Sequence, residues 1–419
     1  MNTTSMNGSN KVVVIGGGAA GMMAAGRAAE CGAHVTLLEP NSRLGKKLLI
    51  TGKGRCTVTN DCPWEDVLKN TPTNPRFLYS ALSRFTPADA KAFFEAHGCA
   101  LKTERGGRVF PVSDRSSDVL AALERYLHEN GVCIRRAAAT EIAVRDGRVS
   151  GVKTAQGPVP ADAVILATGG ASYPLTGSTG DGYRMAAALG HSIVEPVGSL
   201  VPLVERGHDC AAMQGLALKN VTLRLKNSKN KVVFEEFGEL LFTHFGLSGP
   251  IVLSASAHMG RKDEAFTVEL DLKPALDEKT LDERLLRDFE KYANRDFSHA
   301  LDDLLPRSMI PVVVKRSGIA PDEKVHSVTK TQRRQLLDVL KHFAVDIACK
   351  APVEDAIVTS GGVKVKEVDP TTMASRLVLG LYFAGEILDV DAYTGGFNLQ
   401  IAWAIGRAAG EAAAKEEAE

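Results

Sequence analysis

The first part of the chain shows an apolar run, a helical period and a second apolar run. Residues 12–15 (VVVI) are apolar without interruption, as expected for a strand covered on both faces of a sheet. Residues 19–29 have the composition of a helix, and Gly32 precedes an apolar strand at 34–38. A strand, a helix and a strand in this order predict a β-α-β unit over residues 11–39 and hence a parallel sheet.

The pattern predicts further elements up to residue 168. Residues 40–62 have no period and are rich in Gly, Lys and Thr, which is typical of a binding loop. Helices are expected over about 75–84, from the cap Thr86-Pro87-x-Asp89 to Gly98, and over about 117–129. Short strands are expected over 132–168, with a turn at Asp146-Gly147 and a buried last strand at 163–167.

The pattern changes near residue 195. Short alternating strands at 221–225, 232–236 and 266–271 predict a small antiparallel barrel or sandwich, and residues 277–345 are charged and helical in period. Strand-like and Gly-rich segments return at 350, and a helix is expected at 398–415. We therefore predict one α/β domain, made of residues 1–195 and 350–419, that is interrupted by a β-barrel at 196–275 and a helical domain at 276–349.

Composition narrows the class of protein. Lys and Arg number 50, as do Asp and Glu, so a formal net charge of zero argues against nucleic acid or an anionic membrane as a partner bound by bulk electrostatics. The first ten residues are polar and no apolar stretch of bilayer length occurs, so we expect a cytoplasmic protein without a membrane segment. Seven scattered cysteines without CxxC, and ten dispersed histidines, indicate a reduced protein with no metal site.

A glycine fingerprint follows the first strand. In Gly16-x-Gly18-x-x-Gly21, the glycines allow a tight turn, a close approach of a pyrophosphate and close packing of the next helix. The start of that helix offers N–H groups to phosphates. Glu39 lies 18 residues after Gly21, where an acidic residue is expected to bind both hydroxyls of an adenosine ribose. The fingerprint predicts a dinucleotide site.

Two further strands also end in glycine turns. The strand 163–167 leads into Thr168-Gly169-Gly170, a motif that recurs in two-dinucleotide-binding flavoproteins. A strand near 381–384 leads into Gly385-Glu386 and then to a Gly-rich loop and helix at 395–400. In FAD enzymes such a helix points its N-terminus at the pyrimidine edge of the flavin, where N–H groups stabilise the charge of the reduced ring.

These motifs give the chain a clear resemblance. VVVIGGGAAGMMAA, LGKKLLITGKGRCTVTN, LATGGASYPLTGSTGDGY, FTHFGLSGP, TSGGV and GLYFAGEILDVDAYTGGFNLQIAWA are similar to the BaiN-like (YhiN-type) family of NAD(P)/FAD-dependent oxidoreductases, from residue 12 to about 407. The chain is more distantly similar to fumarate-reductase-type flavoproteins. The family commonly has Asn, Gly and Tyr where Thr57, Ala392 and Phe397 stand here. The resemblance implies a two-dinucleotide-binding, Rossmann-like FAD domain with an inserted antiparallel β-barrel and a helical cap.

The resemblance also implies which residues hold FAD. The residues expected at the ADP half are Gly16, Gly18, Ala19, Ala20, Gly21 and Glu39, with the backbone near Thr140 at the adenine. Those expected near the flavin and phosphates are Lys46, Thr51, Gly52, Gly54, Arg55, Cys56, Ala167, Thr168 and Gly169. Those expected to close over the ribityl chain and the ring are Gly385, Glu386, Asp389, Gly396, Asn398, Leu399 and Gln400.

The expected reaction is hydride transfer from reduced flavin to a C=C bond conjugated to a carbonyl, in a bile-acid-like steroid or another apolar enone. NAD(P)H is expected to approach transiently as the electron donor, because no second GxGxxG occurs. A donor must polarise the carbonyl oxygen and an acid must protonate the α-carbon. The candidates are Tyr173, His244, Arg108 and Tyr393.

Other functions stay open on the sequence alone. An aminoacetone-type amine oxidase is one, since some relatives carry that label. A disulfide reductase using Cys56 and Cys62 is disfavoured, because their spacing is one residue too long and no histidine follows His342. A flavin-dependent RNA modifier, or a sensor without turnover, is the third alternative, and the absence of Lys/Arg-rich tracts counts against RNA.

Overall fold

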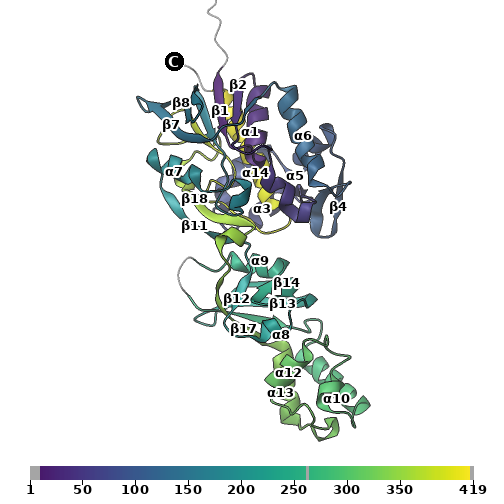
Figure 1. The fold of residues 1–419 in the computed structure, drawn as a ribbon. Coiled ribbons are helices and arrows are strands. Elements are labelled where there is room, and N and C mark those ends of the chain that lie inside the picture. Colours follow the sequence, from purple (N-terminus) through teal and green to yellow (C-terminus); the bar gives the residue numbers. More distant parts are fainter. Residues whose placement is uncertain (1–9, 261–263, 416–419) are drawn as a thin grey trace, which may run out of the picture. The chain divides into compact units, whose positions relative to one another are not determined.

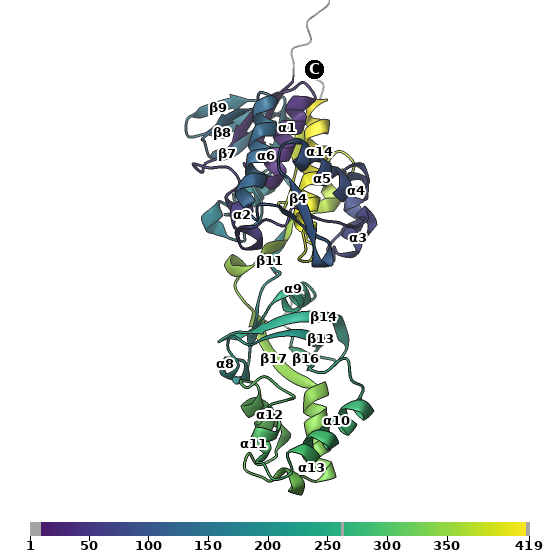
Figure 2. The same ribbon diagram turned by 90° about the vertical axis from the view of Figure 1, so that its right-hand side faces the viewer.

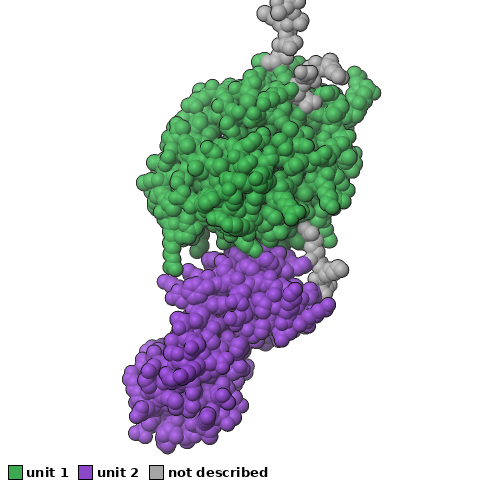
Figure 3. Space-filling view, turned by 180° about the vertical axis from the view of Figure 1, so that it is seen from behind, with its two compact units in different colours: residues 1–199, 353–419 green, residues 200–352 purple. Residues whose placement is uncertain are grey.

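The computed structural model describes residues 10–260 and 264–415. The chain forms two compact units, and Figure 3 colours them separately. Residues 1–199 and 353–419 make the first unit, and residues 200–352 make the second. The sequence predicted these divisions at 195/196 and 349/350.

A five-stranded parallel sheet is the centre of the first unit. Its strand order is β19-β10-β1-β2-β6. The strands are β1 (Lys11–Ile15), β2 (His34–Leu38), β6 (Cys133–Arg135), β10 (Ala163–Leu166) and β19 (Leu381–Phe383). All four residues of β10 are buried, as its unbroken apolar run predicted. The strand β19 joins the edge of the sheet from beyond the second unit in sequence, so the domain is discontinuous.

Two helices from opposite ends of the chain pack side by side on this sheet (Figures 1 and 2). They are α1 (Ala19–Glu30) and α14 (Phe397–Ala414). A Cβ at Gly406 of α14 would lie 2.6 Å from the carbonyl oxygen of Ala20, and one at Gly410 would lie 2.3 Å from that of Ala24. The two helices therefore touch through their backbones, which fixes the start of α14 relative to the start of α1.

Smaller elements complete the first unit. Its other helices are α2 (Lys46–Ile50), α3 (Trp64–Lys69), α4 (Tyr79–Arg84), α5 (Pro87–Ala96), α6 (Ser116–Glu129) and α7 (Asp181–Ala188). Its other sheets are β3-β5-β4 (Thr59–Asn60, Arg108–Pro111, Leu101–Glu104), the meander β7-β8-β9 (Ala139–Arg145, Arg148–Thr154, Gly157–Pro160) and the pair β11-β18 (Ile193–Ser199, Val358–Val363).

Local signals placed several of these elements correctly. Thr86 and Asp89 form the capping box predicted for α5, in which each side chain accepts a bond from the other's backbone N–H. Asp146 and Gly147 make the turn between β7 and β8, both with positive φ (50° and 80°).

The second unit contains a closed barrel, β12-β15-β14-β13-β16-β17. Its strands are Leu203–Glu205, Gly246–Ser248, Val232–Phe242, Ala217–Asn227, Phe266–Asp271 and Phe343–Lys350 in that order. The helices of this unit are α8 (Asp209–Ala212), α9 (Pro250–Ser256), α10 (Glu278–Lys291), α11 (Phe297–Ala300), α12 (Ile310–Ser317) and α13 (Lys330–Lys341).

One barrel strand lies inside the segment that the sequence predicted as helical. The strand β17 begins two residues after α13 ends and buries alternate side chains from Phe343 to Ile347. The helical period therefore changes to a strand period at residue 343, and the barrel closes with residues from the end of the insertion.

No helix in the described part of the chain is both long and apolar enough to cross a membrane. The first nine residues, on which the expected localisation partly depends, lie outside the described residues.

Candidate functional site

The turn from β1 into α1 is packed as closely as its glycines allow. A Cβ at Gly16 would lie 2.5 Å from the carbonyl oxygen of Ala167, and one at Gly21 would lie 1.9 Å from that of Gly16. A Cβ at Gly18 would meet nothing within 4 Å. No described side chain caps α1, so the N–H groups of its first turn are available to an anion beside this open space.

Glu39 is held against this turn. Its Oε2 accepts a bond from the N–H of Gly17 (2.8 Å), and its Oε1 accepts bonds from the backbone N–H (2.9 Å) and side-chain amide (2.8 Å) of Asn41. A carboxylate has about four acceptor positions, so three donors leave room for about one ribose hydroxyl rather than the expected two. Lys46 donates to Asn41 Oδ1 (2.6 Å) and fixes that amide. The sequence analysis missed Asn41, which no motif marks.

The loop after β2 contains a run of unusual backbone conformations. The residues with positive φ are Gly52 (58°), Lys53 (59°), Gly54 (84°) and Cys56 (60°). Thr51 donates its hydroxyl to the carbonyl of Leu48 (2.7 Å), which ties this loop to α2. A Cβ at Gly54 would meet nothing within 4 Å. Two non-glycine residues held in the left-handed region indicate a conformation that the surroundings impose.

In the same loop, Arg55 is partly exposed and Cys56 is fully buried. The Arg55 guanidinium pairs with Glu104 (2.5 Å) and Asp114 (2.6 Å) and stacks on Phe110, 4.0 Å from its ring centroid. The Cys56 thiol is fully buried, and burial raises its pKa to about 12. A protonated, inaccessible thiol cannot attack a disulfide, which removes the basis for a disulfide reductase that uses this residue.

Three glycine turns meet at one edge of the sheet. Since β1, β10 and β19 are neighbouring parallel strands, the turns at Gly16, Gly169 (φ 77°) and Gly385 (φ 85°) all lie at the carboxyl edge. A Cβ at Gly385 would come within 2.8 Å of the side chain of Ala20. Ligands of open α/β sheets bind outside this edge, and each of the three turns carries one of the motifs that the sequence predicted to bind a dinucleotide.

A polar network joins two of these turns. Lys47 Nζ lies 2.6 Å from Glu386 Oε2 and 2.7 Å from Ser172 Oγ. The other oxygen of Glu386 accepts bonds from Ser172 Oγ (3.1 Å) and the N–H of Thr359 (2.7 Å). Sequence reasoning named Lys46 and Glu386 but missed Lys47, Ser172 and Thr359. The stretches LGKKLL, ATGGAS and TSGGV contain them, but no spacing rule connects the three.

The loop before α14 is locked by amide side chains. Asn398 Nδ2 donates to the carbonyl oxygens of Ala392 (2.7 Å) and Tyr393 (3.2 Å), and its Oδ1 accepts from the N–H of Ala392 (2.9 Å). Gln400 is buried and bonds to Thr59 Oγ1 (2.7 Å) and the carbonyl of Phe85 (2.8 Å). The Asn398 amide therefore shapes the loop, and the Gln400 amide ties the first turn of α14 to Thr59 and Phe85.

Two carboxylates in this loop are almost fully buried. Asp389 is 8% exposed and accepts a bond from Asn74 Nδ2 (3.1 Å). Asp391 is 1% exposed; its Oδ2 accepts a bond from Ser199 Oγ (2.7 Å), and its Oδ1 has no hydrogen-bond partner within the described residues. A buried acceptor without a hydrogen bond lowers the stability of the protein, so Asp391 Oδ1 is available to accept a hydrogen bond from a ligand.

The four candidate donors fall in different places. Tyr173 follows the second glycine turn with φ 53°, and Tyr393 lies in the loop before α14. Arg108 begins β5, and its Nε donates to the carbonyl of Arg105 (3.1 Å). His244 is exposed in the tight turn between β14 and β15, in the second unit.

Thr140, the residue expected near the adenine, lies in the meander outside the parallel sheet. It is exposed on β7, and its hydroxyl donates to the carbonyl of Lys153 (3.1 Å).

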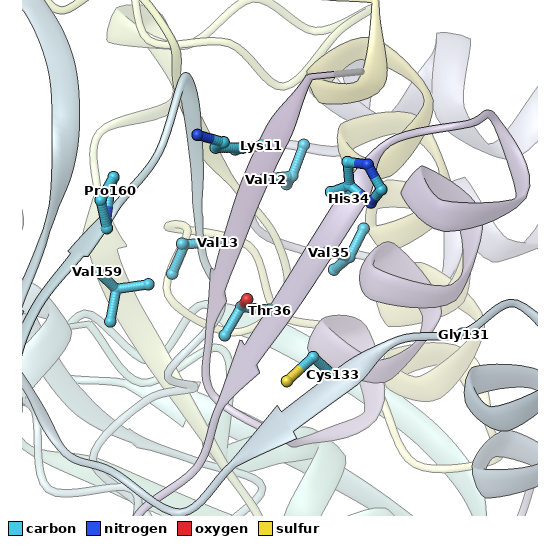
Figure 4. A pocket seen from close by; sticks show the side chains of 10 residues that line it. All are labelled: Lys11, Val12, Val13, His34, Val35, Thr36, Gly131, Cys133, Val159 and Pro160. Carbon is cyan, nitrogen blue, oxygen red and sulfur yellow. The ribbon is translucent and has the colours of Figure 1, made fainter. Parts of the chain in front are cut away.

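A hollow of about 340 Å³ lies elsewhere on the first unit, between the amino-terminal halves of the sheet strands and the meander (Figure 4). Lys11, His34, Cys133 and Pro160 are among its lining residues. Because it lies at the amino ends of β1, β2 and β6, away from the glycine turns, it is not the dinucleotide site. Within the described residues no three His, Cys, Asp or Glu side chains come together to hold a metal ion.

The residues at the carboxyl edge fit a dinucleotide. The open space at Gly18, beside the uncapped start of α1, admits a pyrophosphate. The carboxylate of Glu39, next to the same turn, suits a ribose hydroxyl. The lone oxygen of Asp391 adds an acceptor in the loop that leads to α14.

Known proteins match this chain along nearly its whole length. The family model described as HI0933-like protein Rossmann domain matches residues 10–412. A relative from Clostridium scindens named 3-dehydro-bile acid delta(4,6)-reductase is 32% identical, over 97% of this chain and 99% of its own. One from Haemophilus influenzae named ribosomal RNA dihydrouridine synthase is 31% identical, over 93% of this chain and 95% of its own.

Solved structures agree on the fold. A flavocytochrome c3 fumarate reductase in an open conformation superposes with a TM-score of 0.53 at 17% identity, covering 98% of this chain and 79% of that one. A 3-ketosteroid delta1-dehydrogenase from Sterolibacterium denitrificans gives 0.51 at 13% identity, covering 97% and 100%. The family model and the full-length relatives together show that this chain belongs to the HI0933-like family of Rossmann-domain flavoprotein oxidoreductases.

Proposed function

We propose that the protein is an FAD-dependent reductase that saturates a carbon–carbon double bond conjugated to a carbonyl, with electrons from NAD(P)H. The observation that carries this proposal is that two differently named relatives share one chemistry. A Δ4 bond in a 3-dehydro-bile acid is conjugated to the 3-oxo group, and dihydrouridine is uridine whose C5=C6 bond, conjugated to the C4 carbonyl, has gained two hydrogens.

Saturation of such a bond needs a hydride equivalent at the β-carbon and a proton at the α-carbon. The reduced nicotinamide supplies the electron pair and leaves as NAD(P)⁺, and the α-proton comes from a protein acid or water. FAD, when bound, supplies the two-electron chemistry that links the two substrates. The protein must bind the substrate, polarise its carbonyl and deliver the proton.

Tyr173 is the candidate best supported for polarising the carbonyl or delivering the proton. It directly follows Ser172, whose hydroxyl is fixed by Lys47 and Glu386. Its positive φ of 53° is rare for a tyrosine, and strain of this kind gathers at active sites. Tyr393, whose carbonyl is held by Asn398, is the alternative on the other side of the site's loops. His244 stays a candidate from the second unit.

An apolar enone is the favoured substrate class. The relative named 3-dehydro-bile acid delta(4,6)-reductase, which is 32% identical over 97% of this chain, supports this class. A second candidate is a uracil base in RNA. The similarity to the ribosomal RNA dihydrouridine synthases of Haemophilus influenzae and Escherichia coli (31% and 29% identical) supports it.

An anaerobic titration tests the proposal. The holoenzyme is bleached with NADH or NADPH, and a 3-oxo-Δ4 steroid or a uridine-containing RNA is then added. Reoxidation by the steroid or by the RNA, with the saturated product seen by mass spectrometry, is the expected result and separates the two substrate classes. If neither unsaturated substrate reoxidises the flavin, and the oxidised holoenzyme consumes oxygen with aminoacetone in a separate aerobic assay, the protein is instead an amine oxidase.

A further inference from the structure

The β4–β5 hairpin brings two arginines without carboxylate partners to its tip. The tip reads Arg105-Gly106-Gly107-Arg108, and both arginines are exposed. Arg108 Nε donates to the backbone carbonyl of Arg105 (3.1 Å), which ties the Arg108 side chain to the main chain of the other tip arginine. In the described part of the chain neither arginine forms an ion pair with Asp or Glu.

The neighbouring carboxylates are already used. Glu104 and Asp114 pair with Arg55 (2.5 and 2.6 Å), and Asp114 also pairs with Lys102 (2.7 Å). Hydrogen bonds from Arg55 and Lys102 lower the pKa of these two carboxyl groups. Both carboxyl groups are therefore ionised, and their charges are balanced by Arg55 and Lys102. The positive charge at the hairpin tip is therefore uncompensated locally.

The tip is tied to the loop that precedes α14. The buried Asn60 donates its amide to the carbonyl of Gly106 (3.0 Å) and to that of Gly395 (3.0 Å). The N–H of Asp61 donates to the carbonyl of Gly107 (2.6 Å). Gly395 adjoins Gly396, where α14 starts. One side chain thus fixes the distance between the cationic tip and the loop assigned to the flavin.

We propose that Arg105 and Arg108 form the binding site for a single carboxylate on the substrate, and so select an enone that carries a carboxylate distant from its carbonyl. This proposal rests on the proposed function. Guanidinium groups bind carboxylates through paired, charge-assisted hydrogen bonds. A single small anion fits better than a nucleic-acid strand, because a strand needs a track of unpaired cations along successive phosphates, and Arg55 and Lys102 beside the tip are already paired.

A matched pair of substrates tests the site. The probes are a 3-oxo-Δ4 steroid with a side-chain carboxylate and its methyl ester, which differ in one charge. Their binding to the oxidised holoenzyme is followed by the change in the flavin spectrum, and KM and kcat are measured separately. The variants are Arg105→Gln/Arg108→Gln, each single substitution, and Arg145→Gln as the control. Arg145 is also exposed at the end of a hairpin strand of the first unit, and thermal unfolding and FAD content confirm that each variant is folded.

The wild-type protein is expected to bind the acid about tenfold or more tightly than the ester, as a charge-assisted pair implies. The double variant is expected to lose this preference through KM, and Arg145→Gln to keep it. Equal binding of acid and ester by the wild type, or a preference that survives in the double variant, would overturn the proposal while leaving the reductase intact. Reoxidation by uridine-containing RNA alone would overturn it in favour of an RNA substrate. If nothing unsaturated reoxidises the wild type, the proposed function itself fails.

Discussion

Lys47 Nζ lies 2.6 Å from Glu386 Oε2, and this ion pair connects a short helix after β2 to the turn after β19. Both side chains are about one-fifth exposed (21% and 20%). A carboxylate at the edge of the sheet where we propose that FAD binds repels the anionic cofactor unless a cation neutralises it. Lys47 provides that cation, and Ser172 and Thr359 fix the carboxylate in place.

Replacement of Lys47 should therefore weaken FAD binding, and removal of Glu386 should restore part of the loss. We expect Lys47→Met to raise the FAD dissociation constant about tenfold or more, the scale of a lost hydrogen bond to a charged group, and Lys47→Met/Glu386→Gln to recover part of it. Quenching of flavin fluorescence on titration of the apoprotein measures both. Lys91→Met, which breaks the more exposed pair with Asp61, is the control. Simple additivity of the two substitutions would show that the pair does not act as a unit.

Substitutions of two glycines in the first turn should affect different quantities, FAD binding in one case and protein stability in the other. Gly18 has φ −82°, and a Cβ there would enter open space, so Gly18→Ala is expected to leave the unfolding free energy of the apoprotein within about 0.5 kcal/mol while weakening FAD binding. Gly21→Ala places its Cβ against the Gly16 carbonyl and should cost about 1–3 kcal/mol of stability. Denaturant unfolding and FAD titration give the two quantities. The same stability loss for both variants would contradict this division of roles.

Sequence motifs predicted those parts of the site whose residues lie close together in the chain. Gly16, Gly169 and Gly385 each follow an apolar run closely, so the three motifs can be recognised in the sequence, whereas the strand order that brings their turns to one carboxyl edge is seen only in the structure. The sequence could not show whether Lys46 or Lys47 faces Glu386, because α2 has only five residues and no helical period can be recognised over so short a segment. Similarly, no Gly or Pro marks the boundary between α13 and β17, so the alternation of Phe343, Val345 and Ile347 merges in the sequence with the helical segment before it.

His191 makes the stability of the first unit depend on pH. Its side chain is fully buried, Nε2 lies 2.8 Å from Ser375 Oγ, and Nδ1 lies 3.3 Å from Glu367. Burial lowers the pKa of His191 below 6.5, although Glu367 acts in the opposite direction. The unfolded chain therefore binds the proton more readily, so stability is highest above about pH 6.5 and falls as the pH drops through the lowered pKa of the folded state.

Denaturant unfolding at pH 7.5 and pH 5.5 checks this. We expect the wild type to lose stability between the two values, and His191→Gln, which keeps a polar side chain at this position, to lose less. Glu367, whose pKa is lowered, contributes only at more acidic pH, since that carboxyl stays ionised above its ordinary value of 4.5. An unchanged pH dependence in the variant would exclude His191 as its source.

Tyr173 and Tyr393 are alternative donors of the proton that the substrate gains, and their variants should differ in activity. If Tyr173 donates the proton to the substrate, Tyr173→Phe should lower kcat about 10²-fold or more. KM should change only severalfold, because the variant keeps the aromatic ring. It also keeps the turn in which the N–H of Thr176 donates to the carbonyl of residue 173 (2.8 Å). Tyr393→Phe should then have a much smaller effect. Stopped-flow oxidation of the reduced enzyme by the enone separates this step from reduction by NAD(P)H, which neither hydroxyl should alter. A slow reductive half-reaction in Tyr173→Phe would show that the residue orders the cofactor site. If Tyr393→Phe loses more activity than Tyr173→Phe, the strained turn is structural and the acid lies in the loop before α14.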